Sequence, residues 1–81
     1  MDLKELLDQV HDEASFLAFV RGLLQDWRTD GASWENGTVE DFLESALAWG
    51  ESTRVGSSQG IGSASPWKRA ATLLYCGKIY E

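Results

Sequence analysis

Apolar residues recur at helical spacing in four separate stretches of the chain, with polar residues filling the positions between them. The first stretch carries apolar side chains at spacings i, i+3, i+4 and i+7: Leu3, Leu6, Leu7 and Val10. This spacing places them on one face of a helix, and Asp2 stands where its side chain can cap the first turn. The pattern predicts a short helix over residues 2–10.

A second and longer apolar stripe predicts a helix over residues 13–28. Its members are Phe16, Leu17, Phe19, Val20, Leu23, Leu24 and Trp27. Asp12 and Ser15 are alternative caps for its first turn. Gly22 lies inside the stripe at a cost of about 1 kcal/mol relative to alanine, so we expect another helix to approach the backbone closely there.

Residues 29–37 contain an Asp-Gly and an Asn-Gly pair without flanking strand patterns, so they are predicted to form a loop. The next helix is expected to start at Thr38, whose hydroxyl can accept hydrogen bonds from first-turn amides, and to run to about residue 50. Its buried face would consist of Phe42, Leu43, Ala46, Leu47 and Trp49.

Residues 52–64 are rich in glycine and serine, which predicts a flexible loop or linker. The pair Ser65-Pro66 indicates a new helix, because serine caps a first turn and proline fits the first helical position. The apolar stripe of this last helix is Trp67, Ala70, Ala71, Leu73 and Leu74. Gly77 is predicted to be its left-handed C-terminal cap, and we expect Ile79 and Tyr80 in the tail to fold back on the core.

No stretch has a strand pattern strong enough to build a sheet, and 81 residues suffice for one domain. The sequence therefore predicts an all-α fold. It would be a small single-domain bundle of about four helices over residues 1–81, with the flexible Gly/Ser loop before the last helix.

The charges are distributed unevenly along the chain, which has a formal net charge of −6 and a pI near 4.6. This acidity argues against nucleic acid and anionic membranes as partners. Twelve of the thirteen acidic residues lie in residues 1–51, where only three residues are basic. We expect Lys68, Arg69 and Lys78 to offset these acids when the last helix docks; the alternative is an acidic surface left open for a basic partner.

Candidate catalytic and metal-binding patterns are weak. Glu40 and Glu44 lie one turn apart, but no Glu-x-x-His motif accompanies them, and His11 and Cys76 lack the spacing of zinc ligands. The glycine-rich loop lacks the lysine of a phosphate-binding loop. We therefore expect no enzyme activity, no catalytic residues, no metal site and no cofactor. The absence of a signal-peptide pattern and of a membrane span predicts a cytoplasmic protein.

The tryptophans are the most informative side chains. Trp27, Trp49 and Trp67 fall on apolar stripes and are expected in the core. Trp34 lies in a polar loop, where it is either a lid over the core or a partly exposed anchor for a partner. We expect its indole to be mostly buried, with the N–H edge facing the loop. Asn36 is expected to cap its own turn or the start of the next helix.

Three stretches carry a resemblance to a known family: Trp34 to Glu44 with Trp49 downstream, Pro66-Trp67, and Leu73 to Glu81. In them the chain resembles a family of short, mostly bacterial proteins catalogued as a domain of unknown function. The resemblance implies a bacterial cytoplasmic protein and supplies no catalytic residues. Residues 52–64 match this family least.

Two functional hypotheses follow. The first is a noncatalytic protein-interaction module, with candidate partner-binding residues Trp34, Glu35, Asn36, Glu40 and Glu44. The alternative is an acidic immunity- or antitoxin-like inhibitor that covers a basic partner such as a nuclease. In both cases the partner would be another protein, and the sequence leaves the oligomeric state open.

Overall fold

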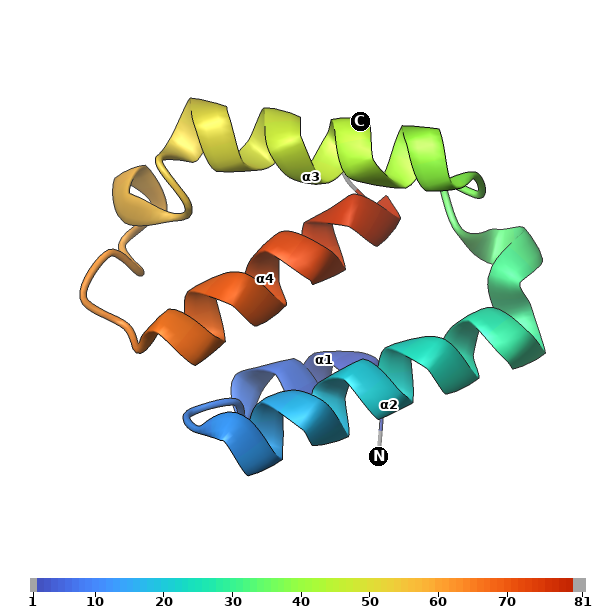
Figure 1. Cartoon of the computed structure of the whole chain (residues 1–81), viewed down its shortest axis with the longest axis horizontal. Coiled ribbons are helices and arrows are strands. Elements are labelled where there is room, and N and C mark those ends of the chain that lie inside the picture. The colour runs from blue at the N-terminus through green and yellow to red at the C-terminus, as the bar shows by residue number, and fades with distance from the viewer. Residues whose placement is uncertain (1, 80–81) are drawn as a thin grey trace.

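Four α-helices and two short 3₁₀ turns make up the computed structural model, which describes residues 2–79 and contains no strand among them (Figure 1). The α-helices are α1 (Leu3–Asp8), α2 (Glu13–Asp30), α3 (Val39–Thr53) and α4 (Pro66–Ile79). The 3₁₀ turns are η1 (Gly31–Ser33), after α2, and η2 (Ser57–Gln59), after α3. The prediction of a small all-α fold with four helices is confirmed.

Each α-helix begins where the sequence indicated a cap. Asp2, Thr38 and Ser65 each accept a hydrogen bond from the backbone amide three residues further on. At the start of α2 the two alternative caps act together. The Asp12 carboxylate accepts from the Ser15 amide at 2.9 Å, and the Ser15 hydroxyl accepts from the Asp12 amide at 3.0 Å. This reciprocal arrangement satisfies two amides that the first turn leaves without helical partners.

The helix ends differ from the sequence prediction by a few residues. The first helix is shorter than residues 2–10, whereas α2 and α3 continue past the predicted residues 28 and 50. At its C-terminus α3 is stopped by Arg54, which has a left-handed φ of 53° and donates its backbone N–H to the Gly50 carbonyl. α3 therefore extends to Thr53, two residues into the serine- and glycine-rich segment that was predicted to be a loop.

The last helix, α4, is the centre of the molecule. In Figure 1, α2 and α3 lie on opposite sides of α4, and α1 lies behind α2. In residues 2–79 no Cα atom of α2 comes within 8 Å of one in α3, so these helices pack on α4 and not on each other.

The buried side chains divide into two groups that meet at α4. The group around α1 and α2 consists of Leu7, Val10, Phe19, Leu23 and Ala71. The group under α3 includes Ala46 and Trp49, which are 3% and 2% exposed. Leu6 of α1 lies against Gly22, where an added Cβ would come within 2.5 Å of Leu6 Cδ1. The close approach of another helix predicted at Gly22 is confirmed.

The prediction that Gly77 caps α4 is wrong, because Gly77 lies inside the helix and is buried. Its role is to admit the Phe42 ring of α3, since a methyl group at this position would lie 2.9 Å from Phe42 Cζ. The expectation for Ile79 is also wrong, because its side chain is 43% exposed instead of folded onto the core. Tyr80 lies outside the described residues.

Replacing Gly77 with alanine should destabilise the fold, although the same change in an exposed helix interior stabilises it by about 0.5–1 kcal/mol. The new methyl group has to displace the Phe42 ring, and overpacking of this kind costs about 1–3 kcal/mol. Urea unfolding of the wild type and of Gly77→Ala measures the difference. A more stable variant would contradict the close packing of α3 on α4.

The basic residues of α4 bind mostly backbone carbonyls instead of the expected acidic side chains. Lys68 Nζ donates to the Leu7 carbonyl near the end of α1 at 2.9 Å, and Arg69 donates to the carbonyls of Arg54 and Val55 after α3 at 3.0 Å. Cations are favoured at helix C-termini, where carbonyls lack helical partners. Among residues 2–79 only Lys78 of these three forms an ion pair with an acid, Asp26.

The glycine- and serine-rich segment takes a defined path in the structure. The Trp49 indole N–H donates to Gln59 Oε1 at 3.0 Å, and Gly56 adopts a left-handed φ of 88° where Ile61 lies against it. Together with the Arg69 hydrogen bonds, these contacts connect the segment to α3 and α4. Its flexibility stays a prediction.

Candidate functional site

Large apolar side chains are exposed along the surfaces of α2, α3 and α4. Trp27 and Trp67, both expected in the core, are 43% and 38% exposed, and Leu43 and Leu47 of the predicted buried face are 58% and 60% exposed. The expectation failed because α2 packs on α1 and α4, and α3 packs on α4, but α2 and α3 do not pack on each other. The contact covers only part of each apolar stripe, and the remainder faces solvent.

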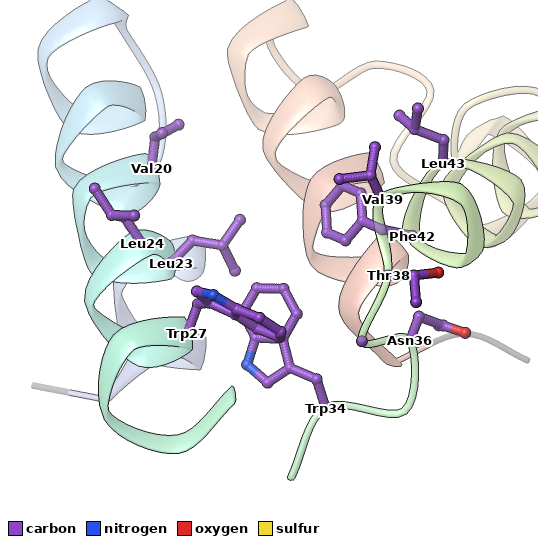
Figure 2. Close-up of a pocket in the computed structure, with 11 residues that line it drawn as sticks. Val20, Leu23, Leu24, Trp27, Trp34, Asn36, Thr38, Val39, Phe42 and Leu43 are labelled. Carbon is purple, nitrogen blue, oxygen red and sulfur yellow. The ribbon is translucent and has the colours of Figure 1, made fainter. Parts of the chain in front are cut away.

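Trp27 and Leu43 are among the side chains that line a hollow of about 520 Å³ between α2 and the start of α3 (Figure 2). Its walls are Val20, Leu24 and Trp27 on α2 and Val39, Phe42 and Leu43 on α3. Trp34 and Asn36, in the loop between these helices, also line it. Figure 2 shows Trp27 and Trp34 together at one end of the hollow.

A second hollow of about 540 Å³ lies over α4. It is lined by Phe16 of α2, by Val55 after α3, and by Pro66, Arg69, Ala70, Leu73 and Leu74 of α4. Phe16 and Val20 are four residues apart, so they lie one turn apart on the same face of α2. The two hollows therefore follow one another along that face. We call them together the α2–α3 cleft: α2 lines both hollows, the start of α3 lines the first, and α4 lines the second.

Trp34 is half-buried and connects three helices. Its ring packs edge-on against Trp27 at 5.2 Å between centroids and stacks on Phe42 at 6.0 Å. The indole N–H donates to Asp26 Oδ2 of α2 at 2.7 Å, and Lys78 Nζ of α4 lies 5.7 Å from the ring centroid. The N–H edge thus faces α2 and not the loop, which corrects the sequence expectation. The reason is that Asp26 offers a charged acceptor eight residues away.

Asn36 also acts over a longer range than expected. Its side-chain amide donates to the Gly77 carbonyl at 3.1 Å, and its backbone N–H donates to the Lys78 carbonyl at 3.4 Å. Both carbonyls belong to the last turn of α4, where helical partners are lacking. Asn36 therefore attaches the loop to α4 and fixes the start of α3 beside it.

The ion pair between Lys78 and Asp26 supports this end of the cleft. Lys78 Nζ lies 2.8 Å from Asp26 Oδ2, and the side chains are 17% and 29% exposed. The hydrogen bond from Lys78, followed by that from Trp34, lowers the pKa of Asp26 below its ordinary value of 3.8, although partial burial opposes the change. The Asp26 carboxylate is thus the charged group that holds Trp34 and α4 together.

This pair should make stability depend on pH below about pH 4. Because the pKa of Asp26 is lower in the folded than in the unfolded state, the pair stabilises the fold above the unfolded pKa, and this stabilisation is lost as the pH falls through the folded pKa. The free energy of unfolding should fall more steeply with acid in the wild type than in Asp26→Asn. Urea unfolding at a series of pH values measures both, and parallel profiles would contradict the role of Asp26.

The three glutamates among the predicted site residues lie outside the cleft or on its edge. Glu35, Glu40 and Glu44 are exposed, and within residues 2–79 none has a basic nitrogen within 4.0 Å. Glu40 and Glu44 each follow a cleft residue, Val39 or Leu43, by one position. A step of one position turns the helix by about 100°, so both carboxylates lie along the outer edge of the α3 wall.

Most of the cleft was not predicted as a site. Trp34 and Asn36, which were predicted, line it, whereas Trp27 and Leu43, which also line it, were expected to be buried. The apolar stripe on α2 is wide, and its width was a signal for exposure: α1 and α4 together leave Leu24 and Trp27 exposed.

Metal ligands, the cysteine thiol and membrane spans concern separate features of residues 2–79. No group of three or more His, Cys, Asp or Glu side chains is placed to hold a metal ion between residues 2 and 79. Burial raises the pKa of the Cys76 thiol, which lowers the fraction of reactive thiolate. None of the helices over the same residues combines the length and hydrophobicity that a membrane span requires.

Comparison with known proteins gives one match. The model of a family of unknown function matches residues 12–81, a range that includes α2, α3 and α4 and begins after α1. No curated protein and no solved structure matches the chain. The matched range contains every element of the α2–α3 cleft.

Proposed function

The chain belongs to DUF7660, a family of unknown function, and from that starting point we propose that it is a noncatalytic protein-interaction module. Its partner, another protein, binds in the α2–α3 cleft. We also propose that the protein is cytoplasmic and that it binds neither nucleic acid nor membranes.

The observation that supports this proposal is the apolar lining of an open cleft. Val39, Leu43 and Leu24 line it and are 76%, 58% and 47% exposed. Soluble monomers rarely expose large contiguous apolar surfaces, and those that do generally use them for binding. Trp27 and Trp34 at one end add the aromatic side chains that dominate the energetics of protein interfaces.

The second candidate function is the acidic inhibitor, and a specific observation favours it. Glu35, Glu40 and Glu44 are exposed without a basic partner within 4.0 Å among residues 2–79. A row of free carboxylates attracts a basic protein and raises its association rate. In this case the carboxylates, and not the cleft, would carry the affinity.

Capture of a partner by matched variants tests the proposal. The wild type, Leu43→Asn and Ala48→Asn would be immobilised and exposed to an extract of cells that produce the protein. Residue 43 lines the cleft, whereas Ala48 is exposed about 140° further round α3. We expect one protein to bind the wild type and Ala48→Asn but not Leu43→Asn, with all three chains folded by circular dichroism.

The same experiment separates the two functions. Equal capture by Leu43→Asn would contradict a cleft-based module. A captured nuclease whose inhibition survives Leu43→Asn, but is lost on charge reversal at Glu40 and Glu44, would establish the inhibitor instead.

A further inference from the structure

The charges along the edges of the α2–α3 cleft indicate what kind of protein segment it takes. We infer that the occupant is an amphipathic helix of about three turns, with lysine or arginine along the edge that faces α3. This inference rests on the proposed function and specifies the partner of the same site.

The shape of the cleft fits a helix. α2 runs along the whole cleft, with the start of α3 opposite it in the first hollow and α4 beside it in the second. An amphipathic helix that lays its apolar face into a groove between helices is a recurring mode of recognition. The cleft-facing stripe of α2 runs from Phe16 to Trp27, which at 1.5 Å per residue is about 17 Å long. A partner helix of about eleven residues, or three turns, matches this length.

The edge of α3 beside the first hollow is acidic. Glu40 and Glu44 are exposed beside the cleft-lining Leu43, and the exposed Glu51, within about 40° of both around α3, continues this row about 12 Å beyond Leu43. Among residues 2–79 none of these three glutamates has a basic nitrogen within 4.0 Å. The row is therefore available to cations on an occupant of the cleft.

The α2 edge has the opposite charge. Arg21 and Arg28 are exposed, and each follows a cleft residue, Val20 or Trp27, by one position. The two edges thus differ in sign, so a helix with basic residues on one edge is attracted in one orientation and repelled in the other. Long lysine and arginine side chains can reach the glutamate row while their stems cover the apolar wall.

A second copy of this chain fits the cleft less well. Two copies would bring together two molecules that each carry a net charge of −6. A helix presented by the second copy from its own α3 would place glutamates, not lysines, beside Glu40 and Glu44. Charge complementarity therefore favours a basic helix from a different protein.

Binding of designed peptides tests this inference. The probes are three helical peptides of about fourteen residues: one with a leucine stripe edged by lysines, one with glutamates in place of these lysines, and one with the lysine peptide's composition in shuffled order. Fluorescence of the cleft tryptophans and calorimetry would measure affinity at low and physiological salt. We expect the lysine-edged peptide to bind at least roughly tenfold more tightly than either of the others.

Matched charge reversals locate the contact. Glu40→Lys with Glu44→Lys should weaken binding of the lysine-edged peptide roughly tenfold and reduce its salt dependence. Glu5→Lys with Asp41→Lys makes the same change in net charge at exposed positions away from the cleft and should change affinity much less. If a reversed chain does not fold, Glu40→Gln with Glu44→Gln should still weaken binding measurably.

Several outcomes would overturn the inference. These are equal affinity for the glutamate-edged or the shuffled peptide, equal effects of the two double reversals, no peptide binding, or a dimer of this chain that Leu43→Asn abolishes. The proposed function fails separately. If no peptide binds but capture of a partner still depends on Leu43, only the basic helix is wrong.

Discussion

Replacing Trp49 with alanine should lower the free energy of unfolding by about 3–5 kcal/mol, the usual range for removal of a core aromatic side chain. Trp49 is 2% exposed and is among the largest fully buried side chains of the described residues. Its ring fills the space between α3 and the following loop, and its N–H binds Gln59. The substitution therefore removes apolar contacts and leaves Gln59 without this donor.

Trp67→Ala is the matched control, because the same residue type is 38% exposed there. Trp67 contacts Phe16 at 5.4 Å between ring centroids, so its loss should cost roughly 1 kcal/mol. Urea unfolding of both variants, followed by circular dichroism, measures the difference. Similar losses for the two tryptophans would contradict the assignment of Trp49 to the core.

Trp34→Ala should cost about 2–4 kcal/mol, less than removal of a fully buried tryptophan because this ring is half-buried. The change removes the contacts with Trp27 and Phe42. It also leaves the Asp26 carboxylate without one of its two donors. Trp34 thus stabilises the fold and lines the cleft, so a loss of partner binding in this variant has to be compared with its loss of stability.

Trp34→Phe separates the two contributions. Phenylalanine retains much of the aromatic contact but cannot donate to Asp26, so we expect a loss of about 1–2 kcal/mol. Trp27→Ala, at a 43% exposed position in the same cluster, should also cost less than Trp34→Ala. A loss in Trp34→Phe as large as in Trp34→Ala would show that the hydrogen bond, and not packing, dominates.

The sequence predicted those features of the fold that depend on neighbouring residues. Helix starts at Asp2, Thr38 and Ser65 were predictable because a cap binds an amide three positions away. The close approach at Gly22 was predictable because a glycine inside a helix needs a compensating contact. A cap and a helix glycine both involve residues within one or two helical turns, so they can be recognised from the sequence alone.

The features that were missed depend on which helices meet. Nothing local indicates that α2 and α3 stay apart, so Trp27 and Leu43 were placed in a core instead of in a cleft. Gly77 and Asn36 were likewise assigned local roles, although each acts on a partner more than thirty positions away, Phe42 and Gly77 respectively. The predicted site therefore included the loop residues Trp34 and Asn36 but not most of the cleft walls.

The central position of α4 constrains how the protein folds as it is synthesised. The hydrogen bond from Lys68 to the Leu7 carbonyl joins residues 61 positions apart, and in residues 2–79 α2 and α3 have no direct contact to hold them together. While α4 is still inside the ribosome, α3 lacks the helix against which it packs, and α1 and α2 have only each other. Short isolated helices are marginally stable in water. Apolar side chains that later form the core are then exposed on the nascent chain, so this protein acquires its fold only when its last helix has emerged.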